Sequence, residues 1–583
     1  MVASADISTR ALQRALEDVW LPVLAISEDG RLDLPHDLPP EVAAGITVVA
    51  LGSERPDIAN RTLLLVVDDV AGLRRAVSRL GGPWSARRVV VVVGRTRGAL
   101  TLRPHPEWGG VDRIEALIVD GAGVTTVELA RRGPADVVLA ALARAAVPMR
   151  ISGPEGLRLA ANGADVPAAD VTVAHRYDPE AKVPPELVIG AAAGPYEKSA
   201  VLGRAPTRID PPPLGPIDEG VFNPTGFPRT PTSAPLDLDP RARLSSELVS
   251  ELRSAPSVRV EWPAPLELVD GLAMTGTVLV SGPVPAQARA ALGDAVADAL
   301  QAPVPDGGDP DHDLRREERS VRLRRAALIA HSSAGWRERV TGGRDRVATG
   351  YGSVSILLPT RRPEQLEFAL GQVARLRQVL PGAEVELVLA THGFHPDRRQ
   401  VADLLDGGAH QVVPVSSEAI LGEVLRAACD AASGDLVMKM GDDDWYSPDI
   451  VTDRLLARRY SGADLVGMPA EIVRLESRDV TLRRKGPSEN HGSFVAGGTL
   501  LLDRSMLRGL GGFRPLRLHE DARLLRSVKV AGGTIYRTHG LGYVLRRKAT
   551  GHTWDPGDDY FLRSETLVAQ WPGFRPSTLL EAP

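Results

Sequence analysis

GDLVMKMGDDDW, residues 434–445, is the stretch that decides the fold expected for the C-terminal part of this 583-residue chain. Gly434 ends a helical pattern, residues 435–440 form a short apolar strand, and three carboxylates follow after Gly441. In a parallel α/β sheet the loops beyond the carboxyl ends of the strands converge, so ligands bind there. Adjacent carboxylates repel one another, and a hard divalent cation removes that cost. The stretch therefore predicts a parallel sheet with a metal-binding acidic turn at a strand end.

The residues around this stretch repeat the alternation of strand and helix. Apolar strands are expected at residues 354–358, 385–389 and 411–415. One intervening helix is expected over residues 366–380, and a second runs from a cap at Ser416 or Ser417 through residue 428. These are successive βα units of a Rossmann-like, mostly parallel sheet.

The earlier part of the chain predicts further domains, because 583 residues exceed one ordinary hydrophobic core. Strands at 46–51, 63–67 and 89–93 and a helix at 137–146 indicate a separate N-terminal α/β domain over residues 1–200. Residues 205–240 are dense in proline and favour an extended connector. A strand at 277–280, a helix at 286–300 and a charged helix at 314–339 with a solvated face complete a middle segment, residues 201–345. Residues 346–575 form the last domain.

The composition excludes some classes of function. A hydrophobic fraction of 43% and a charged fraction of 25% are those of packed globular domains. The net charge of -5 gives no electrostatic basis for nucleic acid as a partner. The single cysteine, Cys429, cannot form an intramolecular disulfide and is expected to be buried in a helix, which fits a reducing compartment.

The location expected from these features is cytoplasmic, either free or at the inner face of the membrane. The N-terminus has no basic region followed by an apolar one, as a secretory signal requires. The longest apolar runs are strand-sized, well short of the ~20 residues that span a bilayer. Any membrane association is therefore expected to be peripheral.

Four segments in order resemble glycosyltransferase family 2, whose members are mostly inverting GT-A enzymes. They are LLPTRRP at the first strand end, GDLVMKMGDDDWYSP, VAGGTLLLDRSMLRGLGGFRPLRLHEDARLL, and GYVLRRKATGHTW. The resemblance covers residues 350–566 and implies a GT-A fold that uses a nucleotide-sugar donor and a divalent metal. An acidic surface turn is the alternative for the triplet alone; the preceding strand, Trp445 and the helix-initiating Pro448 argue against it.

The resemblance assigns the metal and donor roles. Asp442 and Asp444 would hold Mn²⁺ or Mg²⁺ on the donor diphosphate, with Asp443 between them, and the metal would neutralise charge on the departing nucleoside diphosphate. The remaining donor-binding residues implied are Pro359, Thr360, Arg362, Gly498, Arg546 and His552. The alternatives are a solvated strand end for Arg546, a tight strand entry for Gly498 and an ordinary polar loop residue for His552.

An inverting transfer needs a carboxylate that takes the proton of the acceptor hydroxyl. By resemblance Asp521 is the candidate base, and Glu520 positions the acceptor or the base. The alternative is a helix N-terminus, where acidic residues are favoured by the helix dipole without any catalytic role.

Two departures from the family pattern bear on these roles. Many relatives have an Asp pair at the second strand end to bind the base, where this chain has Thr391 and His392. A leading Asp of the metal motif is replaced by Gly441. The donor expected from the resemblance is a UDP-sugar. The two departures affect mainly the prediction of which nucleotide the donor carries.

The leading hypothesis is transfer of a sugar, with inversion, from a nucleotide-diphosphate donor to a hydroxyl of a glycan, lipid-linked or other acceptor, in polysaccharide or cell-envelope synthesis. The alternative is a catalytically impaired GT-A-like module that binds or scaffolds. A nucleotidyltransferase ranks last, because LLPTRRPEQL has arginines but no glycines to hold a triphosphate.

Overall fold

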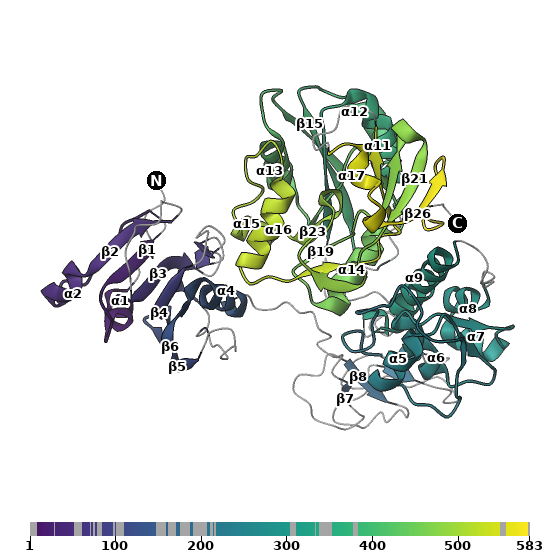
Figure 1. Ribbon diagram of the computed structural model, residues 1–583, viewed down its shortest axis with the longest axis horizontal. Coiled ribbons are helices and arrows are strands. Elements are labelled where there is room, and N and C mark those ends of the chain that lie inside the picture. Colours follow the sequence, from purple (N-terminus) through teal and green to yellow (C-terminus); the bar gives the residue numbers. More distant parts are fainter. Residues whose placement is uncertain are drawn as a thin grey trace. The chain divides into compact units, whose positions relative to one another are not determined.

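The computed structural model gives the helices and strands of the chain (Figure 1), and the chain divides into two compact units. The first comprises residues 1–150, 419–430 and 502–535, and the second comprises residues 151–418, 431–501 and 536–583. The residues described are 8–27, 29–51, 61–69, 72–73, 76–77, 84–96, 100, 110–146, 159–160, 171–174, 187–189, 207–209, 214, 217–302, 311–332, 334–336, 353–376, 380, 383–548 and 556–580.

A six-stranded sheet of order β2-β1-β3-β4-β6-β5 organises the first unit. Its strands are β1 (Val23–Ser27), β2 (Ile46–Ala50), β3 (Thr62–Asp69), β4 (Ser85–Arg95), β5 (Val111–Val119) and β6 (Ala122–Pro134). The first four strands are parallel, and β6 pairs antiparallel with both β4 and β5. The N-terminal part is thus α/β, as the sequence predicts.

Helices cover both faces of this sheet. Alternate residues of the strands face α1 (Thr9–Leu16), as Val90 and Val92 do, or α4 (Ala135–Ala146), as Val89, Val91 and Val93 do. An unbroken valine run is therefore buried on both sides, which is the pattern of a central parallel strand. The first unit also contains α2 (Pro40–Ala44), α15 (Arg504–Gly509), α16 (Glu520–Val530) and most of α13 (Leu421–Ala431).

The second unit contains the four strands of the predicted βα units. Strands β14 (Val354–Thr360), β15 (Val385–His392), β16 (His410–Val415) and β17 (Leu436–Lys439) form one end of an eight-stranded sheet of order β16-β15-β14-β17-β23-β19-β24-β22. They are parallel throughout. The rest of the sheet comprises β19 (Leu465–Gly467), β22 (Asn490–Gly492), β23 (Leu501–Asp503) and β24 (Ile535–Arg537). The α/β class with a mostly parallel sheet is confirmed.

Helix boundaries differ from those expected. Helix α11 (Leu366–Ala374) ends before residue 380, and α12 (Arg398–Leu404) follows β15. The expected cap at Ser416 or Ser417 is wrong, because α13 begins at Leu421 and the Glu423 carboxylate accepts the backbone N–H of Ile420 at 3.0 Å. Ser416 instead accepts the N–H of Glu418 in a turn at 3.2 Å.

A five-stranded sheet of order β18-β25-β20-β21-β26 brings late residues beside the acidic triplet. Its strands are β18 (Trp445–Tyr446), β20 (Ile472–Leu475), β21 (Val480–Arg484), β25 (Tyr543–Arg547) and β26 (Leu567–Pro572). Strands β18 and β25 pair antiparallel, with Trp445 opposite Val544 and Tyr446 opposite Tyr543. Helix α14 (Ile450–Ser461) follows β18, and α17 (Asp558–Phe561) precedes β26.

The middle segment is a small α/β structure. A parallel sheet of β11 (Leu236–Asp237), β12 (Val258–Val260) and β13 (Leu279–Ser281) packs with α5 (Ser246–Arg253) and α6 (Leu266–Met274). The helix expected at 286–300 is two helices, α7 (Ala286–Leu292) and α8 (Asp294–Gln301), separated by Gly293 with φ 84°. The connector expected over 205–240 contains the strands β10 (Thr207–Ile209) and β11, and residues 217–235 between them lack a helix or strand. A further sheet has the order β10-β9-β8-β7, from β7 (Leu159–Ala160), β8 (Val171–Ala174), β9 (Leu187–Ile189) and β10 (Thr207–Ile209).

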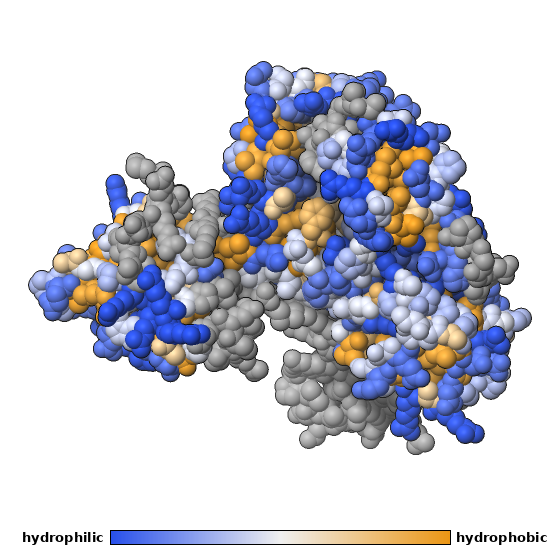
Figure 2. Space-filling view, in the orientation of Figure 1, coloured by the Kyte–Doolittle hydropathy of each residue, from blue (hydrophilic) through white to orange (hydrophobic). Residues whose placement is uncertain are grey.

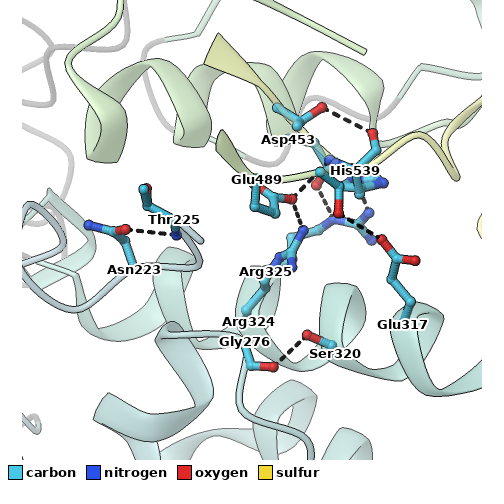
Figure 3. Close-up of polar contacts among 12 residues, drawn as sticks. Asn223, Thr225, Gly276, Glu317, Ser320, Arg324, Arg325, Asp453, Glu489 and His539 are labelled. Carbon is cyan, nitrogen blue, oxygen red and sulfur yellow. Dashed lines mark hydrogen bonds and ion pairs between the residues drawn. The ribbon is translucent and has the colours of Figure 1, made fainter. Parts of the chain in front are cut away.

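Helix α9 (His312–His331) corrects the prediction of a solvated charged helix. Its charged side chains are largely buried, in ion pairs or in hydrogen bonds with other segments of the chain (Figure 3). Arg324 pairs with Glu489, Glu317 accepts Arg483 at 2.6 Å, and Arg325 donates to both oxygens of Asp453 at 2.6 and 2.7 Å. Buried charges are tolerated only when they are paired, and the partners here lie more than a hundred residues away in the sequence.

The visible surface mixes hydrophilic and hydrophobic residues, with several separate apolar patches (Figure 2). The large apolar side chains that are exposed among the described residues are Ile118, Val221, Phe494, Leu518, Val568 and Phe574. Among the helices described, none combines the length and the apolar character needed to cross a membrane.

Candidate active site

The acidic triplet occupies the position that the sequence predicts. Asp442, Asp443 and Asp444 follow the carboxyl end of β17 and lead into β18. Asp442 and Asp444 are each 6% exposed, and Asp443 is partly buried. Three carboxylates that are adjacent and largely buried require compensating hydrogen-bond donors or cations.

Arg362 compensates the first two carboxylates. Its Nε donates to Asp442 Oδ2 at 3.1 Å, its Nη2 pairs with Asp442 Oδ1, and its Nη1 lies 2.8 Å from Asp443 Oδ2. Thr360, the last residue of β14, donates its hydroxyl to Asp442 Oδ2 at 2.7 Å. Burial opposes the charge of Arg362, but the two carboxylates outweigh it and raise its pKa above the ordinary value. The predicted donor residues Thr360 and Arg362 thus meet the predicted metal residues, because β14 and β17 are parallel neighbours.

Asp444 has a different environment. Tyr543 donates its hydroxyl to Asp444 Oδ2 at 2.8 Å, and the backbone N–H of Arg546 donates to Oδ1 at 3.0 Å. Within the described residues Asp444 has no cationic partner. Burial and the neighbouring Asp443 carboxylate raise the pKa of Asp444 to about 7, although the two hydrogen bonds oppose this rise. Asp444 is therefore an acidic group that a cation would stabilise.

Two glycines allow the backbone to approach this carboxylate closely. Tyr446 accepts the N–H of Gly441 at 2.7 Å and donates to the carbonyl oxygen of Gly498 at 3.0 Å. A Cβ at either glycine would lie within 3.3 Å of Asp444 Oδ2. A side chain at position 441 would therefore press on the Asp444 carboxylate, which would have to shift by a few tenths of an ångström.

Arg546 contributes its backbone rather than its side chain to the triplet. The guanidinium Nε donates to Glu476 Oε1 at 2.6 Å. Its carbon lies 5.0 Å from the ring centroid of Trp445 and 5.4 Å from that of Phe368. The guanidinium is therefore held by a carboxylate and two aromatic faces. Pro359 is partly buried within β14, one residue before Thr360.

The predicted catalytic base, Asp521, and its neighbour Glu520 lie at the start of α16. His519, with φ 63°, precedes the helix; Glu520 is buried, and Asp521 Oδ1 accepts the N–H of Ala522 at 2.7 Å. Glu520 and Asp521 belong to the first compact unit, so their roles stay a prediction. His552 lies outside the described residues.

Sequence reasoning missed Tyr446 and Tyr543, which contact the triplet region directly. A signal was present, because each tyrosine lies in a segment already singled out, WYSP and GYVLRR. The sequence did not reveal that the two segments pair as adjacent strands.

The donor set suits a hard cation, because carboxylate oxygens are the ligands that Mg²⁺ and Mn²⁺ prefer. Asp444 has no cationic partner among the described residues, whereas Asp442 and Asp443 are engaged by Arg362. Across the described residues, no three or more His, Cys, Asp or Glu side chains converge as metal ligands.

Comparisons with known proteins give weak similarity. No family model matches the chain, and no curated protein matches it. Among solved structures, the mannosyltransferase PcManGT from Pyrobaculum calidifontis, in complex with GDP-Man and Mn²⁺, is 15% identical with a TM-score of 0.27, over 34% of this chain and 58% of that one. S. aureus TarS 1–349 in complex with UDP-GlcNAc is 15% identical with a TM-score of 0.28, over 34% of this chain and 60% of that one. The matched part is less than two thirds of each of these structures, and neither similarity decides the function.

Proposed function

We propose that this protein is a glycosyltransferase that moves a sugar from a nucleotide-diphosphate donor to a hydroxyl acceptor. The observation that carries the proposal is the meeting of Thr360 and Arg362 with the buried Asp442–Asp444 turn at adjacent parallel strand ends. These strand ends bring together carboxylates that can bind a cation, an arginine that can bind phosphate oxygens, and a hydroxyl group.

In this proposal the donor is held by β14 and the acidic turn. Pro359 and Thr360 line the nucleotide pocket, and Arg362 leaves the carboxylates to pair with the diphosphate. Asp442 and Asp444 hold Mn²⁺ or Mg²⁺, which when bound neutralises charge developing on the departing nucleoside diphosphate. Arg362 has a second role before the donor arrives, because it keeps two buried carboxylates compensated.

The remaining assignments come from the family resemblance. Asp521 takes the proton of the acceptor hydroxyl while the acceptor oxygen bonds to the anomeric carbon and the bond to the diphosphate breaks, which inverts that carbon. Glu520 positions Asp521 or the acceptor. Gly498 lets the backbone approach the sugar, and Arg546 and His552 contact the diphosphate. A UDP-sugar donor, a glycan or lipid-linked acceptor, and a place in polysaccharide or cell-envelope synthesis at the cytoplasmic side complete the proposal.

The test is transfer or hydrolysis from a panel of UDP-, GDP- and dTDP-sugars with Mn²⁺ or Mg²⁺. Release of nucleoside diphosphate is expected from the wild type and is expected to fall at least tenfold in Asp444→Asn. Asp403→Asn, an exposed acid on α12, is the matched control and should be unaffected. A folded protein that shows neither turnover nor nucleotide binding would contradict the proposal.

A second candidate is a GT-A-like module that binds a nucleotide sugar without transferring it. The Arg362 contacts favour it, because they occupy the two carboxylates that a metal would otherwise use. Tight donor binding with no turnover under every metal and acceptor condition would support this alternative.

A further inference from the structure

A pocket separate from the acidic turn lies within the second unit. Its volume is about 640 Å³. One wall is the connector segment 220–228, a second is α5, and the third is formed by Tyr460, Ser461 and His491. None of the described residues assigned above to the donor, metal or base lines it.

Helix α5 presents a polar stripe to this pocket. Ser246, Ser250 and Arg253 are spaced i, i+4 and i+7, which places them on one face of a helix, and all three line the cavity. The hydroxyls of Ser246 and Ser250 make no hydrogen bond to any described residue. They are therefore available to a ligand.

Arg253 brings a positive charge to the same wall. Its side chain donates to the carbonyl oxygens of Asn223, Thr225 and Thr275, and no carboxylate of the described residues forms a salt bridge with it. A guanidinium has five N–H donors, so some remain for a further acceptor. Burial lowers the pKa of Arg253 to about 10, so it stays charged at neutral pH. A cation held by carbonyl dipoles alone attracts an anion into the adjacent space.

None of the described residues that line the pocket is Asp or Glu, so none of them cancels this charge. Glu489 is not among the described lining residues. It pairs with Arg324 and accepts hydrogen bonds from the hydroxyls of Tyr460 and Tyr536 at 2.9 Å each. Figure 3 shows this Arg324–Glu489 pair together with the Asn223–Thr225 turn. Glu489 is thus compensated by its own partners.

We propose that this pocket binds a phosphate group carried by a small hydroxylated molecule, such as a sugar phosphate. The Arg253 guanidinium receives the phosphate, because it combines charge with directed N–H donors. The Ser246 and Ser250 hydroxyls bind ligand oxygens, and the aromatic side chains of Phe222 and Tyr460 lie against the ligand's ring. The proposal does not depend on sugar transfer at the acidic turn.

The test is titration of the full-length chain with glucose 1-phosphate in EDTA, followed by calorimetry and ligand-observed NMR. EDTA keeps metal from the acidic turn, so metal-dependent binding there does not contribute. Glucose 1-phosphate is expected to bind at least tenfold more tightly than glucose, and more tightly than inorganic phosphate. Equal affinity for glucose would overturn the phosphate part of the proposal, and equal affinity for inorganic phosphate would overturn the sugar part.

Two variants on α5 place the binding in this pocket. Ser250→Trp fills the pocket without breaking a hydrogen bond to any described residue. It is expected to weaken the binding of glucose 1-phosphate at least tenfold. Glu247→Trp, on an exposed part of the same helix outside the lining, is the matched control and should bind as the wild type does. Arg253→Met should remove the preference for phosphate over glucose. If Arg253→Met fails to fold because it releases the Asn223–Thr225 turn, the Ser250→Trp result alone decides. Unchanged binding in Ser250→Trp, or no binding to the wild type, would overturn the proposal.

Discussion

Arg362 and Asp442 form a two-point ion pair across adjacent parallel strand ends, and the same guanidinium reaches Asp443 at 2.8 Å. Removing the arginine leaves the buried carboxylate of Asp442 and the partly buried carboxylate of Asp443 without a cation. Their combined charge then attracts a divalent ion more strongly.

Arg362→Ala is therefore expected to tighten Mn²⁺ binding about tenfold, equivalent to about 1.4 kcal/mol, while it weakens binding of a nucleotide diphosphate. Calorimetric titration with Mn²⁺ alone and with UDP and Mn²⁺ separates the two effects. Arg361→Ala, at the exposed neighbouring position, is the matched control. Unchanged Mn²⁺ affinity in Arg362→Ala would contradict the interpretation of Arg362 as a competitor of the metal.

Tyr543→Phe tests the support of Asp444. The variant deletes one of two hydrogen bonds to a buried carboxylate and leaves the Arg546 N–H in place. We expect the free energy of unfolding to fall by about 1 kcal/mol and metal-dependent donor binding to weaken. Urea unfolding and donor titration measure the two effects. A variant with wild-type donor binding would show that Tyr543 only packs.

Asp521→Asn tests the catalytic base. If Asp521 takes the acceptor proton, kcat falls by about 10²–10⁴-fold while the donor binds as before. Single-turnover kinetics and donor titration on the same preparation provide the comparison. Wild-type activity in Asp521→Asn would refute the assignment and leave the acidic residues as a helix N-terminal feature.

Asp453 is expected to contribute stability that depends on pH. Burial alone raises its pKa, but the ion pair with Arg325 and the contact with His539 Nε2 at 3.1 Å outweigh burial and hold the pKa well below the ordinary value. In the unfolded chain the pKa of an Asp side chain is about 3.9. A depressed folded-state pKa means that the stability is present above this value and is lost as the pH falls below it.

Asp453→Asn should therefore destabilise the protein by about 3 kcal/mol near neutral pH and flatten the acid limb of the stability curve. Urea midpoints between pH 7 and pH 2 give both quantities. Asp479→Asn breaks the Arg474 pair, in which the Asp side chain is 78% exposed, and is expected to change stability little. A wild-type acid limb in Asp453→Asn would contradict this account.

Cys429 is expected to be unreactive in the folded protein. It is 3% exposed on α13, and burial together with Asp430 raises the pKa of its thiol to about 11. Ellman's reagent at pH 8 should react with it only after unfolding in urea, because the thiolate is the reactive form. Rapid modification of the native protein would show that this part of α13 opens readily.

Local patterns were sufficient for much of the fold. The valine run at 89–93 and the strand before the acidic triplet appear where hydrophobic periodicity places them. Helix ends were less predictable, since Glu423 rather than a serine satisfies the start of α13. The prediction of a solvated face on α9 was wrong for a different reason, because Glu317 and Arg325 are compensated by residues far away in the chain.

The sequence by itself determined the parallel βα units and the position of Asp442–Asp444 at a strand end, because both follow from short-range periodicity and chain order. Only the tertiary structure decided what surrounds those carboxylates. Tyr543 reaches Asp444 across 99 residues of sequence, and Arg362 reaches Asp442 across 80. Whether a carboxylate is compensated depends on the partners that strand pairing brings to it, and no local pattern specifies those partners.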